Sequence, residues 1–241
     1  MHRIAIALMG AASLTACSMS SGNGTAVPAS GSGPARSYAV EGFDRIAVAG
    51  GDDVDVRAGT GFSVRAEGPA EELERLRIAR DGNDLIIGRE KRAFNFSSGH
   101  GVKIFVTLPR LTEANIVGAG TMTVDRIEGA KFEANIAGSG DLNIAALATD
   151  AADITIAGAG TVRAGGTVKR LEVSVLGSGG LDAAGLRAGE ADVTVAGSGD
   201  VRAAVTGAAT VELMGSGNVD LGAAARCDVS KKGSGSVRCG R

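Results

Sequence analysis

Carboxylate side chains recur at a nearly constant interval through the second half of the chain. The set comprises Glu113, Glu133, Asp153, Glu172, Asp192 and Asp228. Subtracting successive residue numbers gives 20, 20, 19, 20 and 36, the last being two repeats of 18. Carboxylates gathered in one column could bind divalent cations or a basic partner. The alternative is an ordinary solvated face, on which salt screens the repulsion between like charges.

Two aspartates raise the question of calcium at the bends of the chain. Asp141 and Asp200 each follow Gly-Ser-Gly, a phrase that resembles the glycine-rich nonapeptide repeats that bind calcium. The period here does not match those repeats, and several other bends carry Thr, Gly or Asn in place of Asp. Calcium at these turns is therefore a minor hypothesis, and the sequence predicts no metal site.

The residue types needed for catalysis are scarce. The only two histidines are His2 and His100, so a His-based triad lacks its parts, and no metal-ligand spacing appears. Paired carboxylates could serve glycoside chemistry, but polysaccharide grooves usually offer aromatic platforms, and aromatic residues make up 3% of the chain. We therefore expect no catalytic residues, no cofactor and no enzymatic activity. A polysaccharide-active enzyme is the least favoured alternative.

Two cysteines flank the last bend. Cys227 lies six residues before Gly233 and Cys239 six residues after it. An exported compartment would favour a disulfide between them. The bond needs Cα atoms within about 7 Å, whereas opposite sheets of a flattened coil stand about 10 Å apart. A disulfide thus requires the terminal coil to narrow, and two buried thiols are the alternative.

A glycine phrase marks the elements that position these side chains. Gly-(Ala/Ser)-Gly opens at Gly118, Gly138, Gly158, Gly177, Gly197, Gly215 and Gly233. Subtraction gives intervals of 20, 20, 19, 20, 18 and 18 residues, and a period in this range is typical of a solenoid. A sharp corner needs a positive φ or a close backbone approach, both of which a Cβ obstructs. We therefore place these glycines at the bends.

Apolar and polar residues alternate on either side of each bend. The positions two and four before the first glycine, and four and six after it, are almost all apolar and often β-branched. Such alternation predicts strands with one buried face, and the glycine pair in every repeat argues against helices. The predicted fold is all-β, a single-domain parallel β-helix (β-solenoid) with coils of 18–20 residues. Equivalent residues should stack about 4.8 Å apart in ladders along the axis.

A second outward column alternates in sign. It contains Arg163, Asp182, Arg202, Asp220 and Arg238. Opposite charges on neighbouring strands contribute about 0.2–1 kcal/mol per pair, so this column should stabilise the stack.

The ends of the predicted domain, residues 38–241, are less regular than its middle. Residues 46–56 repeat the template once, residues 69–75 predict one short helix, and residues 76–87 read as a hairpin. Regular coils begin at about residue 111. In the last coil Lys231 takes an inward position, which we interpret as a cap against end-to-end stacking.

The N-terminal residues resemble an export signal. An apolar run ends in Leu14-Thr15-Ala16-Cys17, which resembles the lipobox of bacterial lipoproteins. We assign residues 1–16 to a lipoprotein signal peptide and lipidation to Cys17, with an ordinary secretory signal as the alternative. Residues 17–37, rich in Ser and Gly with two prolines, predict a flexible tether. A serine directly after the cysteine, here Ser18, resembles the sorting signal of outer-membrane lipoproteins. We therefore expect a cell-envelope, outer-membrane lipoprotein, on the periplasmic face or the cell surface.

The succession of motifs resembles a bacterial family described as putative auto-transporter adhesins, the head GIN domain. The similarity covers about residues 43–237, from Phe43-Asp44-Arg45-Ile46 through Leu85-Ile86-Ile87 to the repeated Gly-Ser-Gly-Asp-Leu/Val at Gly138 and Gly197. The resemblance implies a β-helix without catalytic residues and a role in adhesion.

Two hypotheses share these features. The first is a non-enzymatic, surface-presenting lipoprotein that binds an unknown protein or polysaccharide through its ladder faces. The second is a periplasmic scaffold that binds peptidoglycan or another envelope protein. The formal net charge of −2 favours neither nucleic acid nor an anionic membrane as partner through bulk charge. The lipid anchor would hold the chain on the outer membrane. The sequence neither favours nor excludes a homo-oligomer.

Overall fold

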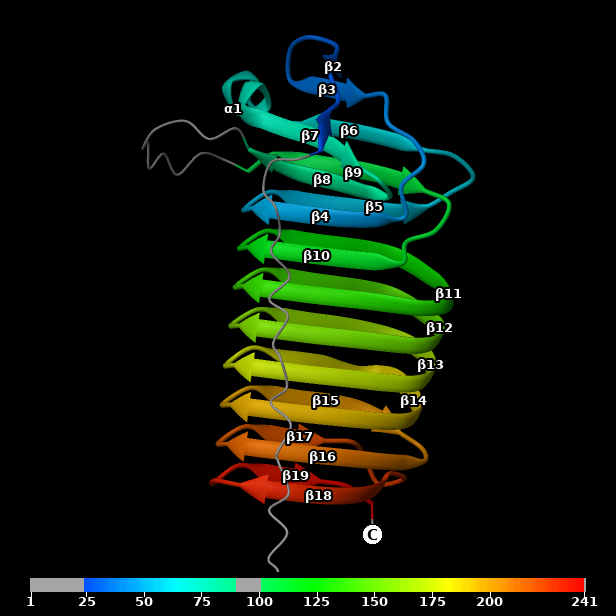
Figure 1. The fold of residues 1–241 in the computed structure, drawn as a ribbon, viewed down its shortest axis with the longest axis vertical. Helices are drawn as coiled ribbons and strands as arrows, with labels where there is room; N and C mark the ends of the chain where they lie inside the picture. Colours follow the sequence, from blue (N-terminus) through cyan, green and yellow to red (C-terminus); the bar gives the residue numbers. More distant parts are fainter. Residues whose placement is uncertain (1–23, 90–100, 241) are drawn as a thin grey trace, which may run out of the picture.

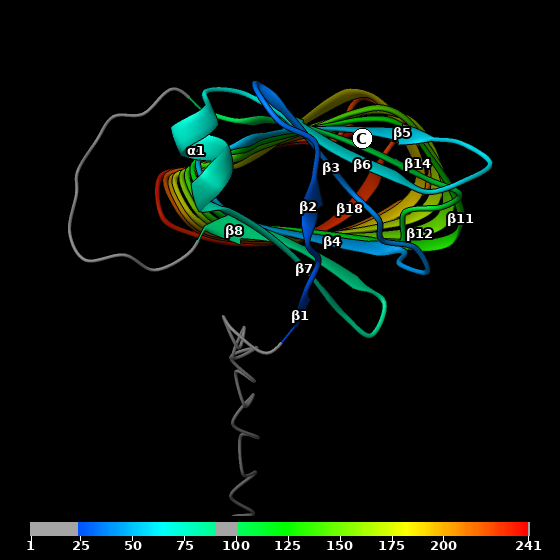
Figure 2. The ribbon, with the colours of Figure 1, turned by 90° about the horizontal axis from the view of Figure 1, so that it is seen from above.

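The computed structural model describes residues 24–89 and 101–240, which wind into a β-solenoid (Figure 1). The predicted signal peptide, the predicted lipidation site Cys17 and His100 lie outside the described residues. Seen along its axis, the stack has a flattened cross-section (Figure 2). The predicted fold class is confirmed, including the coil length and the short helix near the N-terminal end.

Parallel strands build the coils, each pairing with its equivalents in the coils above and below. They are β4 (Arg45–Gly50), β5 (Asp53–Ala58), β10 (Glu113–Gly118), β11 (Thr121–Gly138), β12 (Asp141–Gly158), β13 (Thr161–Gly177), β14 (Gly180–Gly197), β15 (Asp200–Val205), β16 (Ala208–Gly215), β17 (Asn218–Asp220), β18 (Arg226–Lys232) and β19 (Ser236–Arg238). The expected ladder is present, because Ile136 pairs with Ile156 and Ile156 with Val175. These three side chains are buried in the core.

The corners show why the phrase requires glycine. Gly158 has φ +129°, and a Cβ built on it would lie 2.3 Å from the carbonyl oxygen of Gly138 in the preceding coil. That oxygen accepts a hydrogen bond from the backbone N–H of Ala159 at 2.8 Å. Backbone hydrogen bonds thus join the corners of successive coils, in a space that a side chain at the glycine position would fill. They form the left margin of the stack in Figure 1.

The return bends, at the right margin of Figure 1, are more regular than the sequence indicates. We expect a looser return after the second strand, but β11, β12 and β14 each continue through the bend for 18 residues. Register shifts, such as the one between Ala183 and Arg187, absorb the changes in coil length. Between β11 and β12, where no register shift occurs, backbone pairing continues through the bend.

The N-terminal end is closed by elements that cross the top of the stack (Figure 2). They are β1 (Thr25–Ala26), β2 (Ala29–Ser30), β3 (Ala35–Tyr38), β6 (Ser63–Glu67), α1 (Ala70–Arg75), β7 (Leu76–Asp81), β8 (Asp84–Arg89) and β9 (Lys103–Leu108). The hairpin β7–β8 is antiparallel, while β8 also pairs with β4 and carries the ladder upward. The sequence thus places the helix and hairpin correctly.

The structure corrects the prediction of a flexible tether. Residues 17–37 predict a flexible segment, yet from Gly24 onward the described part is paired. Strand β1 is antiparallel to β7, and β3 is antiparallel to β6. Strands of two to four residues with distant partners leave no periodic signal, so composition alone suggests a linker. The folded region therefore begins at least as early as Gly24.

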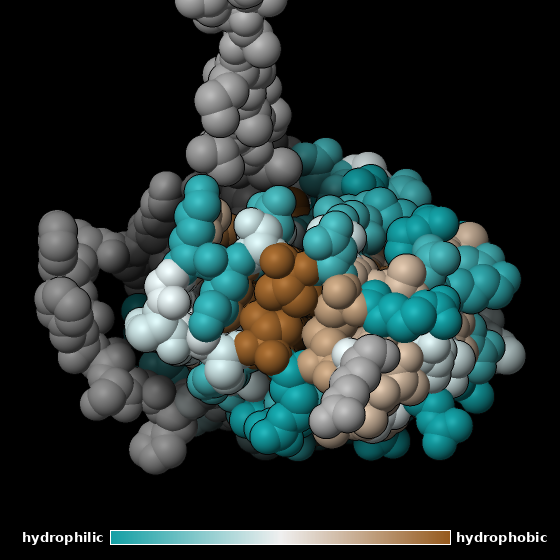
Figure 3. All heavy atoms as spheres, turned by 90° about the horizontal axis from the view of Figure 1, so that it is seen from below, coloured by the Kyte–Doolittle hydropathy of each residue, from teal (hydrophilic) through white to brown (hydrophobic). Residues whose placement is uncertain are grey.

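The opposite end of the stack is open. Strand β18 pairs with β16 on one side only, and Lys231 lies in register with the buried Leu213. Its ammonium donates a hydrogen bond to the carbonyl of Gly235 at 2.9 Å. Figure 3 shows apolar surface on this end, and Val229 of β18 is 43% exposed. Among the described residues, no helix has the length and apolar character needed to cross a membrane.

Candidate binding face

The carboxylates that recur in the sequence come together in one ladder. Cα pairing joins Glu113 to Glu133, then to Asp153, Glu172, Asp192, Thr210 and Asp228. They project from the outer side of the strands that precede each glycine corner. We call this outer side the carboxylate face and the ladder the carboxylate column.

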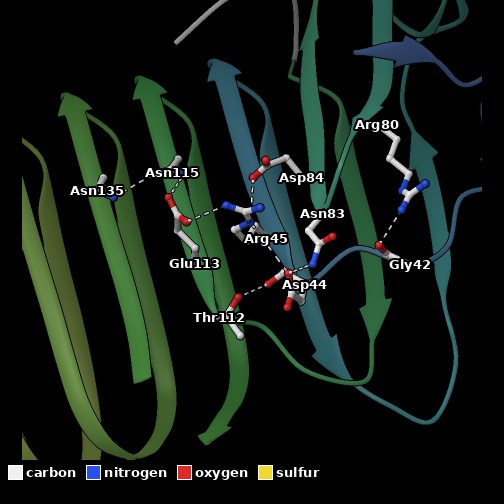
Figure 4. Close-up of polar contacts among 10 residues, drawn as sticks. All are labelled: Gly42, Asp44, Arg45, Arg80, Asn83, Asp84, Thr112, Glu113, Asn115 and Asn135. Carbon is white, nitrogen blue, oxygen red and sulfur yellow. Dashed lines mark hydrogen bonds and ion pairs between the residues drawn. The ribbon is translucent and has the colours of Figure 1, made fainter. Parts of the chain in front are cut away.

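The top of the column is neutralised by an arginine that sequence reasoning missed (Figure 4). Arg45 lies in register between Asp84 and Glu113, and its guanidinium is 3.4 Å from the first carboxylate and 3.8 Å from the second. Burial raises the pKa of Asp84; Arg45 opposes this rise and Glu113 adds to it. Arg45 stands five residues before Gly50, as Glu113 does before Gly118, so extending the count to the diverged first coil would have placed it in this column.

Asparagines extend this network down the face. Asn115 donates to the carboxylate of Glu113 at 2.8 Å, and Asn135 donates to the side-chain oxygen of Asn115 at 3.0 Å (Figure 4). Stacked amides can continue in this way because each has both a donor and an acceptor. The upper part of the face is therefore a closed set of internal hydrogen bonds.

A lysine neutralises the next two carboxylates. The ammonium of Lys131 lies 2.6 Å from Glu133 and 2.7 Å from Asp153. Hydrogen bonds from Lys131 to Asp153 and then Glu133 hold its pKa well above the ordinary lysine value. Like charges at neighbouring ladder positions repel, so a shared cation between two coils offsets that repulsion.

The lower part of the column differs. Within the described part of the chain, Glu172 and Asp192 make no ion pair within 4 Å, although their Cα atoms are ladder neighbours. Two large apolar side chains lie on the same face, four residues further along their strands: Leu176 follows Glu172 in β13, Met214 follows Thr210 in β16, and each is 48% exposed. The small side chain of Ala196 separates these two in the ladder. This is the part of the carboxylate face with charge and apolar surface free for a partner.

The sheet on the other side of the stack satisfies its own charges. Arg202 pairs with Asp182 at 3.6 Å, and Arg238 with Asp220 at 3.6 Å. The alternating column predicted from the sequence therefore forms ion pairs between adjacent coils at two of its steps, while Arg163 lies 3.9 Å from Asp141 of the preceding coil. It stabilises the stack and leaves less unpaired charge for a ligand.

The two bend aspartates act within the fold. Asp141 accepts a hydrogen bond from the backbone N–H of Thr161 in the next coil at 3.1 Å. Asp200 accepts bonds at 2.9 Å from both the backbone and the side-chain amide of Asn218. These contacts tie successive coils together. In residues 24–89 and 101–240, no group of three His, Cys, Asp or Glu side chains is placed to hold a metal ion.

The last coil contains a disulfide between Cys227 and Cys239, whose Cα atoms are 6.2 Å apart. This separation lies within the bound that a disulfide requires. The terminal coil has therefore narrowed relative to two sheets standing face to face.

A buried charge cluster at the N-terminal end was not predicted. Asp52 is 1% exposed, and its carboxylate accepts bonds from Arg89, at 2.5 and 3.1 Å, and from the backbone N–H of Val102 at 3.0 Å. Arg89 also pairs with Glu72 of α1. These interactions raise the pKa of Arg89 above its ordinary value, with the hydrogen bond to Asp52 as the largest cause. The cluster joins the first corner, β8 and α1.

Comparison with protein families gives a match over residues 42–225, to the family described as putative auto-transporter adhesin, head GIN domain. The chain belongs to this family. The match confirms the resemblance indicated by the motifs and covers most of the solenoid of this head GIN domain. No curated protein matches the chain.

Solved structures share the fold of this head GIN domain. A putative adhesin from Bacteroides fragilis NCTC 9343 is 22% identical with a TM-score of 0.78, over 85% of this chain and 95% of that one. A putative adhesin from Parabacteroides merdae ATCC 43184 is 16% identical, with a TM-score of 0.67 over 91% and 98%. A putative lipid binding protein from Parabacteroides distasonis ATCC 8503 is 23% identical, with a TM-score of 0.65 over 86% and 96%. At these identities the likeness concerns the fold.

Proposed function

We propose that this protein is a non-enzymatic lipoprotein of the cell envelope that acts as an adhesin through the lower part of its carboxylate face. The observation that carries the proposal is the presence of unpaired carboxylates and exposed apolar side chains on the same face of the solenoid. Glu172 and Asp192 supply the charge, and Leu176 and Met214 the apolar contacts. Such a surface suits a partner with basic and apolar groups, because hydrophobic contacts supply affinity and complementary charge supplies orientation.

The family supports a binding role. Its description names adhesins, as do two of the structures similar to this chain. The lipobox-like sequence that ends at Cys17 supports a lipid anchor, which would hold the solenoid at the outer membrane. An extended stack of ladders suits attachment, since it displays the same side-chain types over several coils.

Intact cells test exposure and binding together. We expect a membrane-impermeant label to react with the protein on unpermeabilised cells, and the cells to adhere to wells coated with a basic protein such as cytochrome c more than to wells coated with albumin. A variant with Glu172→Gln, Asp192→Asn and Leu176→Ala should be labelled equally but adhere several-fold less. The double variant Asp182→Asn/Arg202→Gln, on the other sheet, is the matched control and should adhere normally.

Two results would contradict the proposal. Labelling that appears only after permeabilisation would favour the periplasmic scaffold, and equal adherence of all variants would exclude the carboxylate face. A Cys17→Ser variant should leave the membrane fraction, whereas a Ser18→Ala variant should stay there. Retention of the Cys17→Ser variant in the membrane would contradict the lipid anchor.

A further inference from the structure

A hollow at the return bends is lined by cations, in contrast to the carboxylate face. It has a volume of about 680 Å³ and lies where β13, β14, β15 and β18 turn. Lys169, Arg170, Arg187 and Arg226 line it, with Glu190 as the carboxylate of the lining. The whole chain carries a formal charge of −2, so this concentration of positive charge is local. We call the hollow the basic groove.

The groove arises from a change in coil length. Ala183 of β14 is in register with Ala203 of β15, and the next residues in register are Arg187 and Ala204. Three residues of β14 therefore have no counterpart in β15. The next coil thus turns back earlier and recedes beneath β14. We infer that the hollow follows from this change in register.

Glycines let successive coils stack closely at the groove. A Cβ on Gly189 would lie 2.7 Å from the carbonyl oxygen of Lys169, and a Cβ on Gly207 would lie 2.4 Å from that of Gly189. Real Cβ atoms do not approach a carbonyl oxygen so closely, so side chains are excluded from two successive coils at this point. The coils therefore lie close together where they turn at this point.

Three of the four cations are available. Lys169 is paired with Asp150 at 2.6 Å. The side chains of Arg170, Arg187 and Arg226 are exposed and have no ion pair or side-chain hydrogen bond in the part of the chain that the structure describes. Arg170 even lies in register with Glu190 without pairing to it within 4 Å. Guanidinium groups bind carboxylate and phosphate in a bidentate geometry, so free arginines around a hollow form an oxyanion site.

The spacing of the arginines points to an extended ligand. In the ladder, Arg170 is in register with Glu190, and Ala208 with Arg226. Glu190 and Ala208 directly precede Ala191 and Ala209, which are in register with each other. Arg170 and Arg226 are therefore three ladder steps apart, or about 14 Å at about 4.8 Å per step. One small anion could not reach both, whereas a chain with repeated anionic groups could.

We propose that the basic groove binds a linear polysaccharide bearing oxyanions, either carboxylates or phosphates. The groove lies at the return bends and does not use the carboxylate face, so this site stands independently of the adhesion proposed above. Thr167 and Thr206 line the same hollow and offer hydroxyl oxygens to sugar hydroxyls. Arg187, at the register shift, is central to the site and contacts the polyanion together with Arg226.

Dextran oligosaccharides test the proposal because one chain can be prepared in three forms. Fluorescently labelled carboxymethyl-dextran, phosphorylated dextran and unmodified dextran are titrated with the full-length protein, and anisotropy is measured at low and high salt. We expect at least one charged form to bind, the neutral form to fail, and affinity to fall as salt rises. Whether the carboxylated or the phosphorylated form binds more tightly identifies the oxyanion, and either result supports the site.

Variants locate the binding. Arg187→Ala/Arg226→Ala should weaken binding at least about tenfold, because two charge-assisted contacts are lost. Glu190→Gln should tighten it. Arg163→Ala/Arg202→Ala removes the same charge from the other sheet and should change affinity less than about twofold. Loss of binding in this control equal to that of the groove variant, or no binding of either charged dextran, would overturn the proposal. Unchanged melting temperatures confirm that the variants are folded.

Discussion

At the scale of single residues, the corner glycines carry the strictest requirement in this chain. Gly158→Ala places a methyl group 2.3 Å from the carbonyl of Gly138 at φ +129°. Strain of this kind and the forced shift of a packed backbone each cost about 1–3 kcal/mol, so we expect a loss of about 2–6 kcal/mol in unfolding free energy. Urea denaturation followed by circular dichroism measures it.

The chain offers a matched control for this substitution. Gly51 occupies the middle position of the first corner, where later corners carry Ala or Ser, and a Cβ there meets nothing within 4 Å. Gly51→Ala should change the free energy of unfolding by less than about 0.5 kcal/mol. Equal losses in the two variants would mean that the corner carbonyls can move aside, and the steric explanation for the repeat would be wrong.

At the scale of elements, the cap over the first coil depends on a buried charge pair. Arg89→Ala would leave the carboxylate of Asp52 buried with one backbone N–H as partner, and breaking such a pair costs about 3–5 kcal/mol. We expect a correspondingly lower midpoint in thermal unfolding. Arg57→Ala removes an exposed ion pair with Asp55 and should cost less than about 1 kcal/mol. If the two variants melt alike, Arg89 does not hold the cap.

These elements also show how far the sequence could predict the molecule. The array is predictable because each coil repeats one local rule, a glycine corner between alternating strands, so register follows from counting. The carboxylate column follows for the same reason. The Asp52–Arg89–Glu72 cluster and strands β1 to β3 are not predictable in this way, since they depend on single contacts between residues far apart in sequence. The basic groove depends on a register shift, which becomes visible only when coils of different length are stacked.

At the scale of the whole molecule, the two ends of the stack differ. The N-terminal end is covered by α1 and short crossing strands, whereas the C-terminal end exposes the edge of β18 (Figures 1 and 2). An exposed edge with apolar side chains would template pairing with another copy. Here Lys231 extends the column of Leu213, and a desolvated ammonium would oppose such stacking.

The variant Lys231→Leu/Lys232→Val removes this protection. The apolar column would then continue to the open end, and a second solenoid could stack on β18 with its core residues in register. We expect the variant to elute earlier than the wild type in size-exclusion chromatography, with a shift that grows with protein concentration. Arg163→Leu/Arg202→Val makes an equivalent apolar change on a side face, away from the edge, and should elute like the wild type. Identical elution of the edge variant and the wild type at every concentration would show that the lysines do not limit end-to-end association, and that the disulfide-closed last coil is a sufficient cap by itself.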